Sequence, residues 1–137
     1  MGTFTPPPPT QTELVAKRLV ELVRDGKHLD AIKELYADNA RHIEAMEMPG
    51  SDCKRITEGK KALLDMAENW NKTTTVHSSS VGPALANGDQ FICEMKMDCT
   101  ASEGPMAGQR MNMSEFAQYT VKDGKISEAK FFYGCGM

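Results

Sequence analysis

The sequence lacks a surplus of basic residues. Its 16 lysine and arginine residues are outnumbered by 19 acidic residues, which gives a formal net charge of -3 at pH 7 and an isoelectric point near 5.6. Because binding to phosphate groups needs a basic patch, we expect neither nucleic acid nor an anionic membrane as a partner. Apolar runs long enough to span a bilayer are absent, and so is the basic-then-apolar order of a secretory signal. Cytoplasmic localisation is therefore the prediction.

The motifs of common metal, phosphate and nucleophile sites are also missing. The four cysteines form no CxxC pair and no zinc-binding spacing. No glycine-rich phosphate loop, serine nucleophile elbow or recognisable Cys–His pair occurs. His42 and Glu44 are two positions apart and could both reach a metal ion, but no third ligand has a suitable spacing. We therefore predict neither a metal nor a cofactor.

Proline is concentrated near one end of the chain. Four of the seven prolines stand together at residues 6–9, in a segment with little to bury. Because polyproline favours an extended, mobile chain, residues 1–11 are predicted to be a disordered arm. Residues 12–137 are numerous enough to form one domain with its own core.

Helical spacing of apolar residues comes first in the domain and strand alternation follows. The predicted helices cover residues 12–25, 29–36 and 58–70. The predicted strands cover a short segment near 40–48 and longer ones at 73–81, 91–100, 109–121 and 126–133. Asp123-Gly124 is the strongest turn signal, because a two-residue hairpin turn needs positive φ. This order predicts an α+β fold with helices packed on one face of a curved antiparallel sheet.

The strand at 109–121 carries one carboxylate in an otherwise apolar row. One face of this strand presents Met111, Met113, Glu115, Ala117, Tyr119 and Val121. Glu115 is then either a rim glutamate that reaches solvent, because burying an unpaired carboxylate is costly, or a glutamate that faces a cavity. A β-bulge between Asn112 and Phe116 would turn Glu115 outward and bring Phe116 inward.

Several strings of residues together resemble one family. They are Asp25-Gly26-Lys27-His28-Leu29-Asp30, Leu35-Tyr36-Ala37-Asp38-Asn39-Ala40, Val121-Lys122-Asp123-Gly124-Lys125-Ile126 and Phe131-Phe132-Tyr133. Their order resembles the SnoaL-like proteins of the nuclear transport factor 2-like superfamily, relatives of ketosteroid isomerases and polyketide cyclases. The resemblance covers residues 12–133. It implies a cone-shaped sheet wrapped around the N-terminal helices, an internal pocket, and a homodimer joined through the outer sheet face.

The resemblance also points to catalytic residues. Glu44 falls where the ketosteroid isomerases keep their catalytic aspartate, while Leu19 stands at the position of their oxyanion tyrosine and Phe116 near that of their second acid. A carboxylate in an apolar cavity has a raised pKa and can move a proton next to a carbonyl group. The predicted catalytic residues are Glu44, His42, Glu115 and Tyr119.

These residues also have simpler interpretations, a solvated strand glutamate for Glu44 and a structural histidine for His42. The catalytic and the simpler interpretations predict different pKa values for the two glutamates. If Glu44 and Glu115 lie on opposite walls of one cavity, at least one should titrate well above the usual value of about 4.3.

Apolar side chains with flexible or aromatic groups are expected to line the pocket and bind an apolar small molecule. The predicted substrate-binding residues are Tyr36, Trp70, Phe91, Cys93, Met95, Phe116, Phe131 and Tyr133. One hypothesis is cofactor-free acid–base chemistry of the isomerase or cyclase type on an apolar carbonyl compound, with Glu44 as the base and Tyr119 or Glu115 in support. The other is a non-catalytic ligand-binding or dimerisation module of the same fold.

The opposite row of the sheet predicts how two copies would meet. It consists of Ile92, Glu94, Lys96, Ile126, Lys130 and Phe132. Because Ile92 and Phe132 are too apolar for a fully solvated surface, we expect a homodimer through this face.

Overall fold

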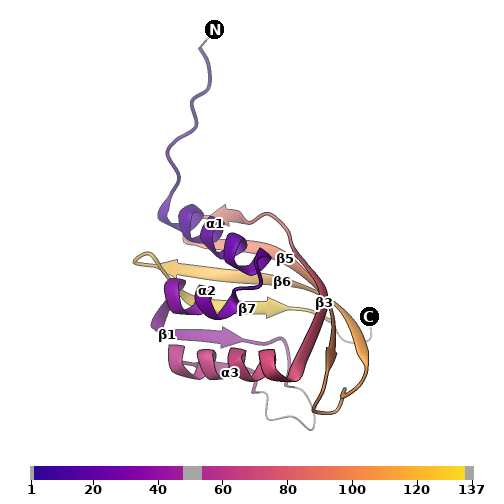
Figure 1. Cartoon of the computed structure of the whole chain (residues 1–137). Coiled ribbons are helices and arrows are strands. Elements are labelled where there is room, and N and C mark those ends of the chain that lie inside the picture. The colour runs from indigo at the N-terminus through magenta and orange to yellow at the C-terminus, as the bar shows by residue number, and fades with distance from the viewer. Residues whose placement is uncertain (1, 48–53, 135–137) are drawn as a thin grey trace.

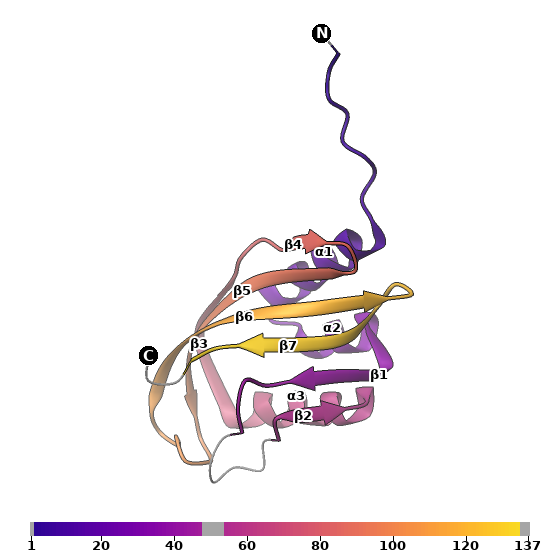
Figure 2. The same cartoon turned by 180° about the vertical axis from the view of Figure 1, so that it is seen from behind.

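The computed structural model describes residues 2–47 and 54–134, and it has helices on one side of a single curved sheet (Figures 1 and 2). The helices are α1 (Gln11–Arg24), α2 (His28–Leu35) and α3 (Lys60–Thr73). The strands are β1 (Tyr36–Ile43), β2 (Ile56–Glu58), β3 (Thr74–Val81), β4 (Leu85–Asn87), β5 (Gln90–Ala101), β6 (Arg110–Lys122) and β7 (Lys125–Phe132). The α+β class predicted from the sequence is confirmed.

The sheet is curved but not closed, and its order is β2-β1-β7-β6-β5-β3 with β4 paired to β5. The sequence predicted antiparallel pairing throughout. One pair differs, because β1 runs parallel to β7 and places His42 beside Ala129. The first and last long strands of the domain therefore end on the same side of the molecule (Figure 2). That arrangement brings the C-terminal end of the domain beside Glu44.

Helix α1 begins inside the segment that the sequence assigned to the arm. Thr10 is its N-cap: the Thr10 side chain accepts a hydrogen bond from the Glu13 amide, and the Glu13 carboxylate accepts one from the Thr10 amide, both at 3.1 Å. This reciprocal capping box satisfies two amides that the first helical turn leaves without partners. The helix predicted to begin at Thr12 therefore begins one residue earlier, at Gln11, and Thr12 itself is buried. Residues 2–9 are exposed and extend away from the domain (Figure 1).

Helix α2 and strand β1 follow each other directly, whereas the sequence predicted a gap of three residues between them. The helix ends at Leu35, and Tyr36 already belongs to the strand, so Asp38 and Asn39 lie in β1 and not in a turn. Strand β2 was not predicted, since three residues are too few to show alternation. It pairs with β1 at Arg41 and Glu58.

The hairpin of β6 and β7 has the predicted turn, with φ of 52° at Asp123 and 76° at Gly124. The register then shifts, because Thr120 pairs with Glu128 while Val121 pairs with Ile126. Ser127 is the extra residue of this β-bulge. Ile126 consequently points into the core and is fully buried. Its place in the predicted outer row was therefore wrong.

The pairing of β5 with β6 has no such shift. It continues in register from Gln90 opposite Thr120 to Thr100 opposite Arg110. A bulge near Asn112 is thereby excluded, so Glu115 lies on the concave face of the sheet and Phe116 on the convex face.

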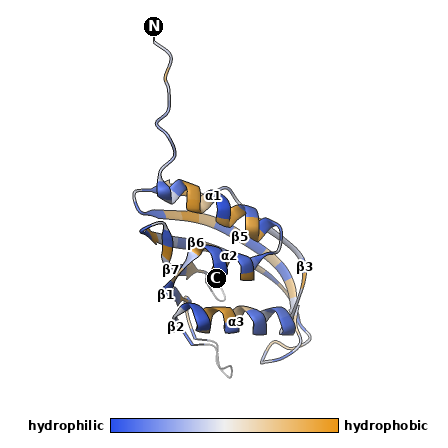
Figure 3. Cartoon of the chain, turned by 60° about the vertical axis from the view of Figure 1, so that its left-hand side comes forward, coloured by the Kyte–Doolittle hydropathy of each residue, from blue (hydrophilic) through white to orange (hydrophobic). Residues whose placement is uncertain are grey.

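The core fills the space between the helices and the concave face. Its largest fully buried side chains are Leu19 of α1, Leu63 of α3, and Phe91, Cys93, Cys99 and Ile126 of the sheet. Each helix has a hydrophobic and a hydrophilic side (Figure 3). Cys93 and Cys99 are buried free thiols, while Cys53 and Cys135 lie outside the described residues. No helix in the described ranges is long and apolar enough to cross a membrane.

Candidate functional site

A chain of three hydrogen-bonded side chains lies where β1 and β7 end together. The ring nitrogen Nε2 of His42 is 2.6 Å from Oε1 of Glu44. The hydroxyl of Tyr133 donates to the other carboxylate oxygen, Oε2, at 3.0 Å. The backbone fixes this end of β1 as well, because the Glu44 amide donates to the carbonyl of Arg55 at 2.7 Å. Both oxygens of Glu44 are thus engaged by side chains from two strands that are distant in sequence.

These partners determine the charge of Glu44. Burial raises the pKa of its carboxyl group, but the hydrogen bond and charge of His42 and the hydrogen bond from Tyr133 together outweigh burial. The net pKa lies below the ordinary value, so Glu44 is ionised at neutral pH. Burial and the negative charge of Glu44 raise the pKa of the Tyr133 hydroxyl, which keeps it protonated as a donor.

Glu115 has the opposite environment. It stands in the middle of β6, opposite Met95, and its carboxyl group accepts no hydrogen bond from another described residue. Burial, with a smaller contribution from the charge of Glu44, raises its pKa to about 7. Tyr133 is close enough to both acids for each to affect it: it follows Phe132, the partner of Phe116, and the charges of Glu44 and Glu115 both raise its pKa. One acid is therefore fixed as an anion, and the other changes protonation near neutral pH.

An aromatic layer continues from this cluster into the core. The ring of His42 lies 4.5 Å from that of Phe131, and Phe131 meets the edge of Tyr119 at 6.3 Å. Tyr119 is stacked on Phe91 at 4.7 Å, and its hydroxyl group interacts with that of Tyr36. Burial raises the pKa of both tyrosines, so their hydroxyl groups stay neutral. Tyr119 is 2% exposed and lies on the same face of β6 as Glu115.

Comparison with known proteins shows the family to which the chain belongs. A family model described as a SnoaL-like domain matches residues 10–133. The chain belongs to the SnoaL-like family. No curated protein matches it.

Solved structures agree with this family. A proposed SnoaL-like polyketide cyclase from Mesorhizobium loti is 37% identical, with a TM-score of 0.79 over 88% of this chain and 97% of that one. A proposed isomerase from Bacillus subtilis is 18% identical, with a TM-score of 0.67 over 90% and 86% of the two chains. An NTF2-like protein from Burkholderia pseudomallei, 9% identical, has a TM-score of 0.71 over 91% and 92%. The last two show the fold alone.

Most of the predicted site residues of this SnoaL-like chain are neighbours. Glu44, His42, Tyr133 and Phe131 are joined by the contacts above, and Glu115 is coupled to Glu44 through charge. Tyr119, Phe91 and Tyr36 belong to the aromatic layer that continues from Phe131 into the core. Met95 faces Glu115 across the β5–β6 pair, and Cys93 faces Ala117 two residue pairs further along these strands. Burial, together with the charge of Glu115, raises the pKa of the Cys93 thiol to about 11, so this thiol is uncharged.

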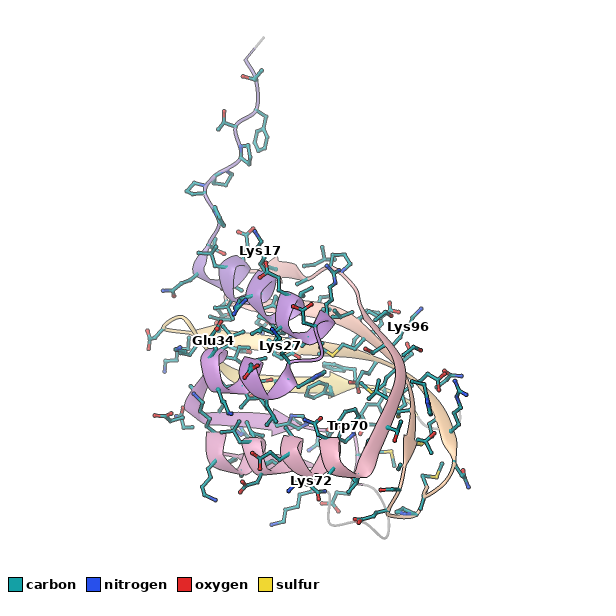
Figure 4. All side chains as sticks on the ribbon, viewed as in Figure 1. Lys17, Lys27, Glu34, Trp70, Lys72 and Lys96 are labelled. Carbon is teal, nitrogen blue, oxygen red and sulfur yellow. The ribbon has the colours of Figure 1, made fainter. Side chains whose placement is uncertain are left out.

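Two predicted residues do not join the cluster. Phe116 is 49% exposed on the convex face, because the unbroken register turns its side chain away from the helices. Trp70 lies at the C-terminal end of α3 (Figure 4), where its ring is 6.4 Å from that of His28. His28 was not among the predicted residues. Its side chain is largely buried, and burial lowers its pKa, so it is a neutral polar group beside Trp70.

The clearest hollows of the described chain are elsewhere. They lie on the convex side, around Leu85 and Ile92, and have volumes of about 430 and 280 Å³. They are therefore not the concave-face pocket that the sequence predicts. Among residues 2–47 and 54–134, no three His, Cys, Asp or Glu side chains come close enough to hold one metal ion.

Proposed function

We propose that this SnoaL-like protein catalyses cofactor-free proton transfer on an apolar carbonyl compound, of the isomerase or cyclase type. The observation that supports this most directly is the asymmetry of its two acids. Glu44 is bonded by His42 and Tyr133 and remains an anion, whereas Glu115 has a pKa of about 7. A protein that separates the pKa values of two neighbouring carboxyl groups holds one as a charge and the other as a proton carrier.

The roles of the two acids follow from their environments. A general acid or base works best when its pKa is close to the working pH. Glu115 meets this condition, while the lowered pKa of Glu44 makes it a weak base. In the proposed reaction, ionised Glu115 takes a proton from the carbon next to the carbonyl, leaving an enolate. The neutral Glu115 acid then returns this proton to another carbon of the conjugated system, or to the oxygen formed in a cyclisation.

Glu44 and its partners support this step without carrying the proton. The negative charge of Glu44 contributes to the raised pKa of Glu115. Tyr133 and His42 hold Glu44 in place, so its charge stays at a fixed position. Phe91 and Tyr119 of the aromatic layer are buried, and a buried apolar environment strengthens the interaction between two charged groups.

Solvent deuterium exchange tests this proposal without knowledge of the natural substrate. A panel of apolar ketones is incubated with the protein in deuterium oxide, and exchange next to the carbonyl is followed by NMR. We expect catalysed exchange that rises with pH around 7 and falls by about 100-fold or more in Glu115→Gln. Glu94→Gln is the matched control, because Glu94 lies on the adjacent strand but faces the convex side. Equal exchange rates in wild type and Glu115→Gln would refute the catalytic role.

A non-catalytic ligand-binding module is the second candidate. It is supported by the apolar character of the residues next to Glu115, namely Met113, Ala117 and Met95. Flexible methionines adapt to apolar ligands of different shapes. This candidate predicts that an apolar ligand binds equally well to wild type and Glu115→Gln, with no deuterium exchange in either.

We also propose a homodimer formed through the convex face. Ile126 is buried and does not belong to this face. The exposed apolar residues of the convex face are Leu85, Ile92, Phe116 and Phe132. An exposed apolar group of this kind is typical of a contact surface. Light scattering that gives a monomer at micromolar concentration would count against it.

A further inference from the structure

Two exposed apolar features of the molecule have no partner within the described chain. One is the arm of residues 2–9, which carries four prolines and Phe4, a residue that is 87% exposed. The other is a groove on the convex face, formed by two adjoining hollows that share Leu85 and Ile92. Leu85 is 68% exposed at the centre of this groove. Water is in contact with apolar surface at both places, which is unfavourable.

The arm is separate from the family domain. The SnoaL-like match begins at residue 10, which is the N-cap of α1. The arm is therefore not needed to complete the common fold. Its sequence contains no charged side chain between Gly2 and Pro9.

The groove matches the arm in length. The two hollows extend along β5 from Gln90 to Lys96, six residue steps or about 20 Å at 3.3 Å per residue. Eight residues in the polyproline conformation span about 25 Å at 3.1 Å per residue. A single extended arm is thus long enough to cover the whole groove.

The groove also matches the arm in chemistry. Pro83, Leu85, Ile92 and Phe116 give it an apolar and partly aromatic lining. Its two charged residues neutralise each other, because Lys96 Nζ lies 3.3 Å from Glu94 Oε1. Grooves lined by aromatic and apolar side chains are the usual receptors of polyproline segments, whose extended form loses little entropy on binding.

The direction of the arm distinguishes between two sources of such a segment. Helix α1 packs on the concave side of the sheet, whereas the groove lies on the convex side. To reach its own groove the arm would have to turn around the edge of the sheet. Figures 1 and 2 instead show it running straight away from the domain. We propose that the arm of one copy binds in the convex-face groove of a second copy.

This proposal is independent of the chemistry on the concave face. It gives the expected homodimer an exchanged segment, and it assigns a partner to Phe4 and to the prolines. When the two domains are already in contact, each arm binds its groove within the same dimer. An arm that binds only weakly by itself therefore still strengthens the association.

Sedimentation equilibrium on four forms of the protein tests the exchange. They are the full chain, a variant lacking residues 2–9 but keeping the Thr10 cap, Ile92→Lys in the groove, and Leu14→Lys as the control. Leu14 is an exposed apolar residue of α1 that lies outside the groove. We expect the arm deletion and Ile92→Lys each to weaken dimerisation by about tenfold or more, and Leu14→Lys to leave it unchanged. Dimerisation that is as strong or stronger without the arm would overturn the proposal.

Amide NMR spectra distinguish the source of the arm. The spectra of the full chain and of the deletion variant should differ at amides of Gly82, Ile92 and Lys96. If the arm comes from a second copy, these differences disappear on dilution. Differences that are independent of concentration would mean that the arm folds back on its own chain, and the absence of differences would mean that it does not bind the groove. Either result overturns the exchange.

Discussion

The replacement Glu115→Gln should stabilise the folded protein at high pH and not at low pH. Burial and the charge of Glu44 raise the pKa of Glu115 from 4.5 to about 7. At 1.36 kcal/mol per pKa unit, this difference corresponds to about 3 kcal/mol between the two protonation states. The folded protein loses this free energy progressively as the pH rises from 4.5 to about 7, and the full amount is lost above pH 7.

The direction of the pH dependence follows from proton binding. Between pH 4.5 and about 7, Glu115 is protonated in the folded state and ionised in the unfolded state. The folded state therefore binds more protons, and the free energy of unfolding falls as the pH rises through this range. Glutamine cannot ionise, so Glu115→Gln removes this loss. Its stability relative to wild type should increase from pH 5 to pH 8 by about 3 kcal/mol.

Urea unfolding of both proteins at half-unit steps from pH 5 to pH 8.5 measures this difference. The constant effect of the amide itself cancels, because only the change of the difference with pH is used. Glu94→Gln is again the control, and its difference from wild type should be flat over this range. A flat difference for Glu115→Gln as well would show that Glu115 titrates normally, and would remove the physical basis of its proposed role.

Three further substitutions test the parts of the structure that position the site. Tyr133→Phe removes the 3.0 Å donor to Glu44; because this hydrogen bond lowers the pKa of Glu44, that pKa should rise in carboxyl-carbon NMR. An unchanged pKa would show that this bond does not hold the anion. Thr10→Ala removes the N-cap of α1 and should cost about 1 kcal/mol in thermal unfolding, whereas deleting residues 2–9 should leave a dilute monomer equally stable. Ile126→Ala should cost about 2–5 kcal/mol, because the side chain is fully buried; a loss below about 1 kcal/mol would contradict the bulge at Ser127.

The elements that could be predicted from the sequence are those specified by near neighbours. The primed turn at Asp123-Gly124 depends on two residues that tolerate positive φ, and it is found where predicted. The alternation along β5 and β6 correctly places Glu115 on the same face as Tyr119, since the register between these strands is unbroken. Helix periodicity gave α1 and α3 to within a few residues. Local chemistry therefore determines most of the element order.

The features that could not be predicted depend on pairing between distant segments. Nothing in the residues around Glu44 indicates that β1 runs parallel to β7, yet this pairing brings Tyr133 to its carboxylate. The sequence gives no sign of the bulge at Ser127 either, because the alternation of residues alone places Ile126 on the outer face. Packing determines the conformation there, because burying the Ile126 side chain stabilises the fold more than the disrupted strand pairing at one bulge destabilises it.

The same long-range pairing explains why two similar glutamates differ in protonation. In the sequence, both stand in predicted strands, and Glu44 was predicted to be the base with Glu115 in support. In the fold, Glu44 lies just past the end of β1, where β7 also ends and where side chains from two strands can donate to it. Glu115 lies in the middle of β6, where its neighbours Met113, Ala117 and Met95 have no strong donor. Strand ends provide donors and strand centres provide burial. The position of each acid along its strand, more than its residue type, therefore determines which one holds charge and which one can move a proton.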